Sequence, residues 1–444
     1  YVSMHITREP LYPTFLALCR GIGRLVRMDA LFVTVILQSL LAGAAAWYAG
    51  DTARKAGNGS RLLQAAAILC QFAVTLLCRF AANRGSAYTD SILTEGLGLS
   101  LFVFFSCDLF LYLWMRKSGY LCRTLLWSFL LVSLRKQMMV TLLIMGIVFA
   151  WYELIKNRRI RWFMSLCVMI CGVFFAGKLF DRCYQYAVRG VWMEHSGNSM
   201  GILCTLLYSS DAVSDRELFE DETIRRLYEE IMEQADEQQI LYPYAEPGWL
   251  PVAVHYADSY DAIGYGIINP VVEGYLSENF RYSDEEAAMK YDEICGVMSR
   301  TLFRQKLQPL LRVYLYNIWR GFVNSVAKAN HLLSVYAGAV YLVTGIGAWY
   351  LIRQRRRLKL QIRQPSEGAE ASVMKYRELM ERIDRSLCFA FIVTAGIVIN
   401  TLVVGMIIFT QPRYMIYGMG LFYTACCMLA RDILACFQMR RTAG

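Results

Sequence analysis

Long apolar blocks constrain the fold of this chain more than any other feature of its sequence. Blocks of about twenty residues recur along the 444 residues, of which 56% are hydrophobic and only 18% charged. A helix of about twenty apolar residues spans the hydrocarbon core of a bilayer. The composition is too apolar for a soluble protein with one hydrophobic core. The sequence therefore predicts an all-α polytopic membrane protein embedded in the lipid bilayer.

The apolar blocks predict nine membrane spans. Their approximate ranges are 29–49, 61–82, 92–114, 119–134, 137–154, 162–180, 332–353, 388–410 and 414–436. They divide the chain into an N-terminal transmembrane module (1–180), an extracytoplasmic insertion (181–331) and a C-terminal transmembrane module (332–444). The N-terminal module begins with an amphipathic, interfacial helix that starts near Pro13. The C-terminal module carries a charged cytoplasmic loop, 354–386.

Positive charge is concentrated in the loops between alternate spans. The formal net charge of +10 therefore indicates orientation in a membrane and not nucleic-acid binding. Loops rich in Lys and Arg stay in the cytoplasm, which places the loops at 83–91, 135–136 and 411–413 on the other side together with the insertion. The prediction is a multi-pass plasma-membrane protein whose site is extracytoplasmic.

Local signals predict that the insertion is folded and rich in helix. Ser214 to Glu217 has the pattern of a capping box ahead of an amphipathic helix, and Ser283 to Glu286 repeats this pattern. Pro, Gly and Tyr are frequent between Tyr242 and Tyr275, which predicts loops and turns there.

Two carboxylates stand where a polar loop runs into the third span. Asp90 is at the edge of the span and Glu95 lies five residues further on. Ionisable groups at membrane depth usually face a bundle interior or a water-filled cavity, so both residues are candidates for a site. On one helix they would lie about 140° apart and would not form a tight pair. The alternative is that Asp90 caps the helix and Glu95 is a buried, hydrogen-bonded acid.

Three arginines lie at span ends on the predicted extracytoplasmic side, where the loop-charge rule does not account for them. They are Arg8, Arg135 and Arg413. Arginine binds phosphate bidentately, and carboxylates together with phosphate oxygens can hold a divalent cation. These residues predict a site for a lipid-linked phosphate. Alternatively, each arginine reaches out to lipid headgroups.

Other polar residues have simpler interpretations. Asp108, deep in the third span, is expected to bond a neighbouring helix. The four histidines show no metal-like spacing. Asp258 and Asp261 could contact an acceptor, although turn chemistry explains them equally well.

Four short stretches resemble the motifs of the GT-C superfamily of integral-membrane glycosyltransferases. The stretch from Arg8 to Pro13 resembles the segment after the first external loop of that family, and Thr89 to Glu95 resembles its acidic motif. Leu131 to Lys136 occupies the position of an Arg-Pro pair, and Gln411 to Tyr414 contains an Arg-Tyr pair. The order of spans also agrees. The nearest groups are bacterial relatives of protein O-mannosyltransferases and of lipid A aminoarabinose transferases.

The resemblance implies a GT-C-like bundle and a hexosyltransferase that uses a polyprenyl-phosphate-linked sugar donor. The acceptor would be a protein, lipid or glycan, and family members commonly use a divalent metal such as Mg²⁺ or Mn²⁺. By position, Asp90 becomes the catalytic and metal-binding acid, and Glu95 a supporting catalytic acid. The remaining matched residues become contacts to the donor phosphate: Arg8, Tyr88, Arg135, Arg413 and Tyr414. The general base is expected in a segment before Tyr1, and Lys136 replaces the family's proline.

The rival interpretation is a non-catalytic lipid-linked saccharide transporter or a cell-envelope assembly protein. A transporter should show two related halves with corresponding broken helices. The sequence contains no visible internal duplication, and the insertion interrupts any symmetry. The glycosyltransferase is therefore the favoured prediction.

Overall fold

The structure is a computed structural model that describes residues 8–81, 87–196, 199–305, 307–363 and 370–443. Within these ranges every regular element is helical and there is no strand, so the predicted all-α architecture is confirmed. The chain forms two compact units, which are described one at a time. Residues 15–177, 325–399 and 415–444 are called the bundle unit. Residues 1–14, 178–324 and 400–414 are called the insertion unit.

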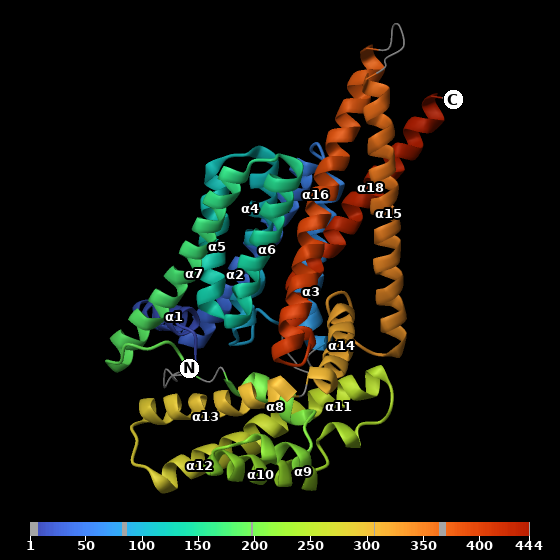
Figure 1. Cartoon of the computed structure of the whole chain (residues 1–444). Coiled ribbons are helices and arrows are strands. Elements are labelled where there is room, and N and C mark those ends of the chain that lie inside the picture. The colour runs from blue at the N-terminus through green and yellow to red at the C-terminus, as the bar shows by residue number, and fades with distance from the viewer. Residues whose placement is uncertain (1–7, 82–86, 197–198, 306, 364–369, 444) are drawn as a thin grey trace. The chain divides into compact units, whose positions relative to one another are not determined.

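Long apolar helices dominate the bundle unit (Figure 1). Among the described residues, seven helical stretches are long and apolar enough to cross a membrane. They are Ala30–Ala56, Thr94–Met115, Lys136–Lys156, Ile160–Arg189, His331–Arg363, Val373–Ile407 and Pro412–Met439. Two further apolar helices, Arg61–Leu77 and Ser118–Leu134, are shorter. Each of the nine predicted spans thus coincides with an apolar helix, and the chain is a membrane protein.

The helices follow one another with short connections. After α1 (Leu11–Val26) come α2 (Ala30–Ala56), α3 (Arg61–Ala81), α4 (Thr94–Met115), α5 (Ser118–Leu134), the run η1, α6 and η2 (Lys136–Met139, Val140–Phe149, Ala150–Lys156) and α7 (Ile160–Arg189). The C-terminal elements are α15 (His331–Arg363), α16 (Glu370–Ile407), α17 (Pro412–Met415), η6 (Ile416–Gly418) and α18 (Met419–Ala443). The chain enters α2 through Asp29, whose carboxylate accepts hydrogen bonds from the first free backbone N–H groups. It leaves α2 at Gly57.

Helix α4 forms the buried centre of the bundle unit. Most of its side chains are buried, and it packs against α2, α5 and η6. Two glycines near its start make these contacts close. A Cβ atom on Gly96 would stand 2.7 Å from the amide of Gln38, and one on Gly98 would stand 3.0 Å from the ring of Tyr417. Glycine at these two positions therefore lets α2 and η6 approach the helix backbone.

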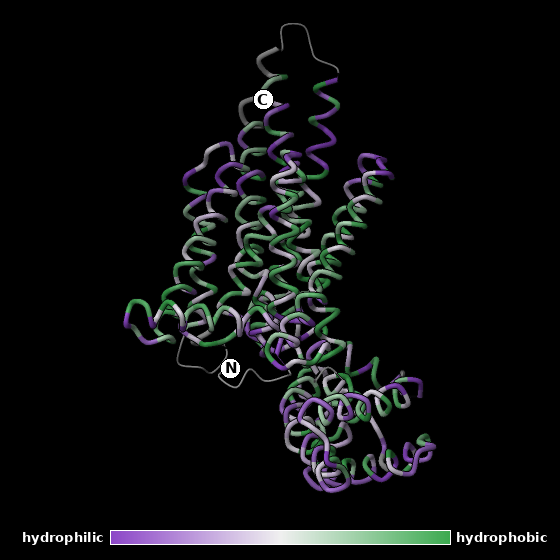
Figure 2. The backbone as a smooth tube through the Cα atoms, turned by 90° about the vertical axis from the view of Figure 1, so that its left-hand side faces the viewer, coloured by the Kyte–Doolittle hydropathy of each residue, from purple (hydrophilic) through white to green (hydrophobic). Residues whose placement is uncertain are grey.

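The outer helices of the bundle unit expose large apolar side chains. Val168 and Phe175 on α7 are exposed, as are Leu332 and Val343 on α15. Figure 2 shows hydrophobic residues along the bundle helices and hydrophilic residues at their ends. Apolar surface of this extent is stable when it faces lipid.

The insertion unit has a hydrophobic core of its own. Its helices are α8 (Ser199–Tyr208), α9 (Ala212–Asp215), η3 (Arg216–Leu218), α10 (Glu222–Glu237), η4 (Tyr242–Tyr244), α11 (Trp249–Asp261), η5 (Ala262–Ile268), α12 (Asn269–Asn279), α13 (Asp284–Gln305) and α14 (Leu307–Asn324). Fully buried core residues include Leu206, Ile231, Tyr256, Ile267 and Met298. The separate core explains why residues far from the apolar blocks still fold compactly.

The two predicted capping boxes have different outcomes. The box at 283–286 is confirmed: Ser283 N donates to Glu286 Oε2 at 3.0 Å, and Glu286 N donates to Ser283 Oγ at 3.3 Å. The box at 214–217 is wrong, because the amphipathic helix α10 begins later. Its cap is Asp221, whose carboxylate accepts from Thr223 N at 2.8 Å and from Ile224 N at 3.0 Å. The helix itself is present, with Ile231 in the core.

The prediction of loops and turns over 242–275 is wrong. Helices α11, η5 and α12 run almost without interruption from Trp249 to Asn279. The Tyr, Ile and Val side chains along one side of this stretch are buried in the unit's core, for example Tyr260 and Ile263. Their burial outweighs the local turn preference of Pro and Gly. Pro270 is tolerated because it lies in the first turn of α12.

Helix α14 binds the segment 400–414 through a buried amide network in the insertion unit. Asn317 Nδ2 donates to the carbonyls of Gly405 and Ile408 at 2.9 and 3.0 Å, and its Oδ1 accepts from Thr410 N at 2.8 Å. Asn324 Nδ2 donates to Thr410 O at 2.6 Å. Side chains from α14 thus satisfy backbone groups where α16 ends.

Candidate functional site

The loop before α4 carries Asp90 outside the helix. Helix α4 begins at Thr94, and the residue that precedes it, Leu93, makes no side-chain cap. Asp90 lies in a turn closed by its own N–H, which donates to Ala87 O at 3.3 Å, and its side chain is exposed. The expectation that Asp90 and Glu95 stand on one helix is therefore wrong, and so is the alternative in which Asp90 caps that helix. The carboxylate faces solvent from an ordered turn.

A glutamine from α2 holds this loop in place. Gln38 Nε2 donates to Thr89 O at 2.9 Å and to Ser91 O at 3.1 Å, and the Gln38 side chain is fully buried. These two bonds come from a residue more than 50 positions away in the chain. They keep the two carbonyls on either side of Asp90 out of the helix. Sequence reasoning missed Gln38, because a single buried glutamine in an apolar block has no local signature.

Glu95 forms a buried ion pair with Arg135. Arg135 Nη1 donates to Glu95 Oε1 at 2.7 Å, and the two side chains are 20% and 2% exposed. The Thr94 hydroxyl lies 3.2 Å from the other carboxylate oxygen. Arg135 reaches Glu95 because α5 ends there in extended backbone, before η1 begins. The prediction that Glu95 is a buried, hydrogen-bonded acid is confirmed for this residue.

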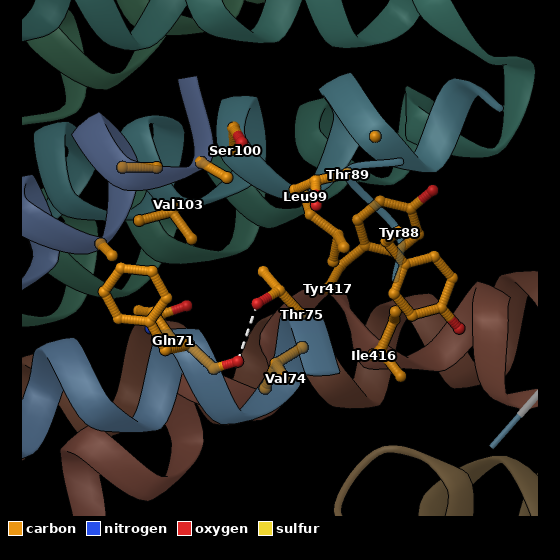
Figure 3. A pocket seen from close by; sticks show the side chains of 15 residues that line it. Gln71, Val74, Thr75, Tyr88, Thr89, Leu99, Ser100, Val103, Ile416 and Tyr417 are labelled. Atoms are coloured by element: carbon orange, nitrogen blue, oxygen red, sulfur yellow. Dashed lines mark hydrogen bonds between the residues drawn. The ribbon is translucent and has the colours of Figure 1, made fainter. Parts of the chain in front are cut away.

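Tyr88 belongs to the packing of the bundle unit. It is buried in a cluster with Val74, Ile416 and Met419. Figure 3 shows its ring beside that of Tyr417 at a small cavity, which Gln71 and other polar side chains also line. The cavity volume of about 30 Å³ has room for about two water molecules and is too small for a sugar.

Arg8 and Arg413 both belong to the insertion unit. Arg413 Nη2 donates to the Tyr414 hydroxyl at 2.6 Å, and the guanidinium lies 4.7 Å from the centre of that ring. Partial burial raises the pKa of Asp261, and the charge of Arg413 opposes this shift. Partial burial and Asp261 also raise the pKa of Tyr265, which Arg8 opposes. Arg413 therefore acts on Asp261, and Arg8 acts on the neighbouring Tyr265.

A histidine between two carboxylates lies in the same unit. His195 Nδ1 is 2.7 Å from Asp181 Oδ2, and its Nε2 is 3.9 Å from Glu9 Oε1. All three side chains are mostly buried. The Asp–His pair has the geometry of a general base whose ring is oriented by an acid. Sequence reasoning missed it because the 14-residue separation of Asp181 and His195 matches no local pattern.

Asp108 bonds neighbouring helices, as predicted. Its carboxylate accepts from Arg123 Nη2 and from Trp127 Nε1, each at 2.8 Å, and also bonds the hydroxyl of Tyr48. This network joins α2, α4 and α5. Two other residues considered from sequence, His5 and Arg84, lie outside the described residues.

The described residues contain no group of three or more His, Cys, Asp or Glu that could hold a metal ion. Asp90 alone offers an exposed carboxylate at the predicted position. Magnesium in phosphate-transfer sites is commonly held by one or two carboxylates together with substrate phosphate and water. The single carboxylate therefore fits a divalent metal that binds with a phosphate donor.

Neither protein-family models nor curated proteins nor solved structures match the chain. The assignment to the GT-C superfamily therefore stays a prediction from four short motifs and the order of the spans.

Proposed function

We propose that the chain is a membrane glycosyltransferase that moves a sugar from a polyprenyl-phosphate donor to an acceptor at the extracytoplasmic face of the plasma membrane. One observation carries this proposal. Asp90 is an exposed carboxylate on a loop that Gln38 clamps at the start of the central helix, where a buried Glu95–Arg135 pair follows. Such a loop presents a charged group in a fixed position next to the bilayer.

The orientation comes from the loop charges. The positive-inside rule places the loop with Asp90, the 135–136 junction and the insertion outside the cell. Polyprenyl-phosphate donors have their phosphate at the membrane surface, where an exposed acid at a span end can approach it. The alternation of Lys- and Arg-rich loops along the chain supports this orientation.

The residues take distinct roles in this proposal. Asp90 would hold Mg²⁺ or Mn²⁺ against the donor phosphate, and the bound metal would neutralise charge on the departing phosphate. The family resemblance assigns contacts with phosphate oxygens to Arg8 and Arg413, and within the insertion unit Arg413 lies beside Tyr414. Glu95 and Arg135 act as a positioning pair, because the Glu95 carboxylate is buried against its arginine.

In the transfer step, the acceptor oxygen would bond to the anomeric carbon and give up its proton to a base, while the bond from that carbon to the phosphate oxygen breaks and polyprenyl phosphate leaves. Within the insertion unit, Asp181 and His195 have the geometry of an imidazole oriented by an acid.

The test compares Asp90→Asn with Asp29→Asn. Both residues are exposed acids of the bundle unit, and Asn caps a helix about as well as the Asp29 that it replaces. Membranes containing matched amounts of each variant are supplied with a panel of radiolabelled polyprenyl-phosphate hexoses, and label in protein, lipid and glycan fractions is counted. Asp90→Asn should lose at least about 10²-fold in transfer rate, whereas Asp29→Asn should keep it.

Two results would count against the proposal. Transfer at the wild-type rate by Asp90→Asn would remove this residue from the chemistry. Failure of the wild-type chain to transfer any sugar of the panel, combined with movement of the intact donor across vesicles, would identify a transporter.

A further inference from the structure

A cluster of three arginines lies in the bundle unit, at the end of α2 far from Gln38. Arg382 and Arg385 belong to α16 and Arg431 to α18 (Figure 1). Arg382 and Arg431 both pair with one carboxylate, that of Asp432, which is completely buried. The Arg382 and Arg431 side chains are each 22% exposed.

The Asp432 carboxylate accepts bonds from several neighbours. Its Oδ1 accepts from Arg431 Nε and Nη2 at 2.9 and 2.7 Å and lies 2.8 Å from Arg382 Nε. Its Oδ2 accepts from the Ser386 hydroxyl at 2.6 Å. Asp432 therefore pairs with two of the three arginines, Arg382 and Arg431.

Arg385 is held without a carboxylate partner among the described residues. Its Nη2 donates to Asn58 Oδ1 at 2.5 Å, and its guanidinium lies 5.0 Å from the centre of the Trp114 ring. Arg385 Nε and Arg431 Nη1 are buried and make no hydrogen bond with the described residues. Buried donors without partners are unfavourable, so these two N–H groups indicate a missing acceptor.

The other acids near the cluster are engaged or exposed. Asp384 pairs with Arg355, whose Nη2 lies 3.2 Å from its Oδ2. Glu378 is exposed and accepts from Asn58 Nδ2 at 3.0 Å. Glu381 is exposed on α16, and its negative charge acts on Arg385. The net charge of the cluster therefore stays positive.

The backbone at the end of α2 allows these arginines to approach closely. Helix α2 ends at Gly57, where a Cβ atom would stand 2.2 Å from Arg431 Nη1. Any other residue would displace the guanidinium. Asn58 follows with a positive φ of 54°, and this turn brings its amide to Arg385. A solvated arginine that reaches for the membrane surface would point outward, whereas these side chains converge on a buried residue.

We infer that Arg382, Arg385 and Arg431 form a binding site for a phosphate group. Guanidinium forks match phosphate oxygens in pairs, and Arg385 Nε and Arg431 Nη1 are donors available for such contacts. The phosphate belongs either to the headgroup of an anionic phospholipid in the leaflet at this end of the bundle or to a soluble phosphate compound. The site is separate from the Asp90 loop, so the inference does not rest on the proposed function.

Binding is measured on the purified full chain in nanodiscs. One set of discs contains phosphatidylcholine alone with added inorganic phosphate, and the other contains phosphatidylcholine with phosphatidylglycerol. The readout is modification of arginines by phenylglyoxal, located by mass spectrometry. Either probe should slow modification of Arg385 and Arg431 at least about fivefold, while exposed Arg353, over Trp349 on α15, is unaffected. Protection by phosphatidylglycerol identifies a lipid headgroup, and protection by inorganic phosphate identifies a soluble ligand.

Two variants complete the test. Arg385→Gln should abolish protection of Arg431, and Arg385→Lys should reduce it to less than half, because a lysine keeps the charge but loses the planar fork. Arg353→Gln is the matched control and should retain full protection. If neither probe protects Arg385 or Arg431 in the wild-type chain, the inference is wrong whether or not the variants fold. Equal protection of Arg353 would also contradict the inference, because it would show that the probe acts on exposed positive charge in general.

Discussion

Arg135→Ala should destabilise the bundle unit more than Glu95→Gln. Removal of Arg135 leaves the carboxylate of Glu95, which is 2% exposed, without its ion-pair partner. The Thr94 hydroxyl, 3.2 Å from Oε2, carries no charge and cannot replace the guanidinium. Breaking a buried pair in this way costs about 3–5 kcal/mol.

Glu95→Gln has a smaller expected cost. The glutamine keeps the shape and one acceptor oxygen, and Arg135 is 20% exposed, so its guanidinium can turn toward water. The loss is that of a charge-assisted hydrogen bond, about 1.5–3 kcal/mol. The double variant should cost less than the sum of the two single variants, because the second substitution removes a group that has already lost its partner.

The measurement is unfolding of the purified chain in mixed micelles, followed by tryptophan fluorescence as the fraction of denaturing detergent rises. Lys117→Ala is the control, since Lys117 is an exposed cation beside the same helix and makes no side-chain cap. A cost for Arg135→Ala below about 1 kcal/mol, or equal to that of Lys117→Ala, would show that the pair does not hold the loop end of α4. Additive costs in the double variant would refute the coupling.

Two further predictions concern the loop with Asp90 and the cluster around Arg413. Gly96→Ala should push the Gln38 amide away from Thr89 and Ser91, since the new Cβ would stand 2.7 Å from it, and the loop should then be cleaved faster by protease. Gly119→Ala, where the Cβ meets no atom within 4 Å, should leave the cleavage rate unchanged. Binding of polyprenyl phosphate should tighten as pH falls through the raised pKa of Asp261, because protonation removes a negative charge near Arg413. Asp261→Asn should bind equally well across that pH range, and a retained pH dependence in this variant would assign the effect to another group.

The membrane architecture could be predicted because its physical signal is local. A span needs about twenty apolar residues in sequence, and this requirement is visible without any partner. The predicted 92–114 span, for example, corresponds to α4 at Thr94–Met115. The capping box at Ser283 could also be predicted, because its two hydrogen bonds lie within four residues.

The candidate site was harder to predict because distant residues define it. The start of α4 depends on Gln38, which lies 51 residues from Thr89 and holds two carbonyls out of the helix. Arg135 was considered from sequence as a phosphate contact, yet its carboxylate partner lies 40 residues away. The helices over 249–279 form because tyrosines such as Tyr256 are buried in a core that brings together many segments. Local turn preferences contain no information on that burial.

The amide network between α14 and residues 400–414 sets the order in which the insertion unit can be completed during synthesis. Thr410 follows Asn324 by 86 residues, and the ribosome adds about 5–20 residues per second. The amides of Asn317 and Asn324 therefore wait roughly 4–17 s for their partners after they are made. Two long apolar helices must be made and inserted in that interval. A chain that ends before residue 400 would carry the whole of the 178–324 segment and still lack the carbonyls that anchor α14. The insertion unit can therefore reach its final structure only after the last loop before α18 has been translated.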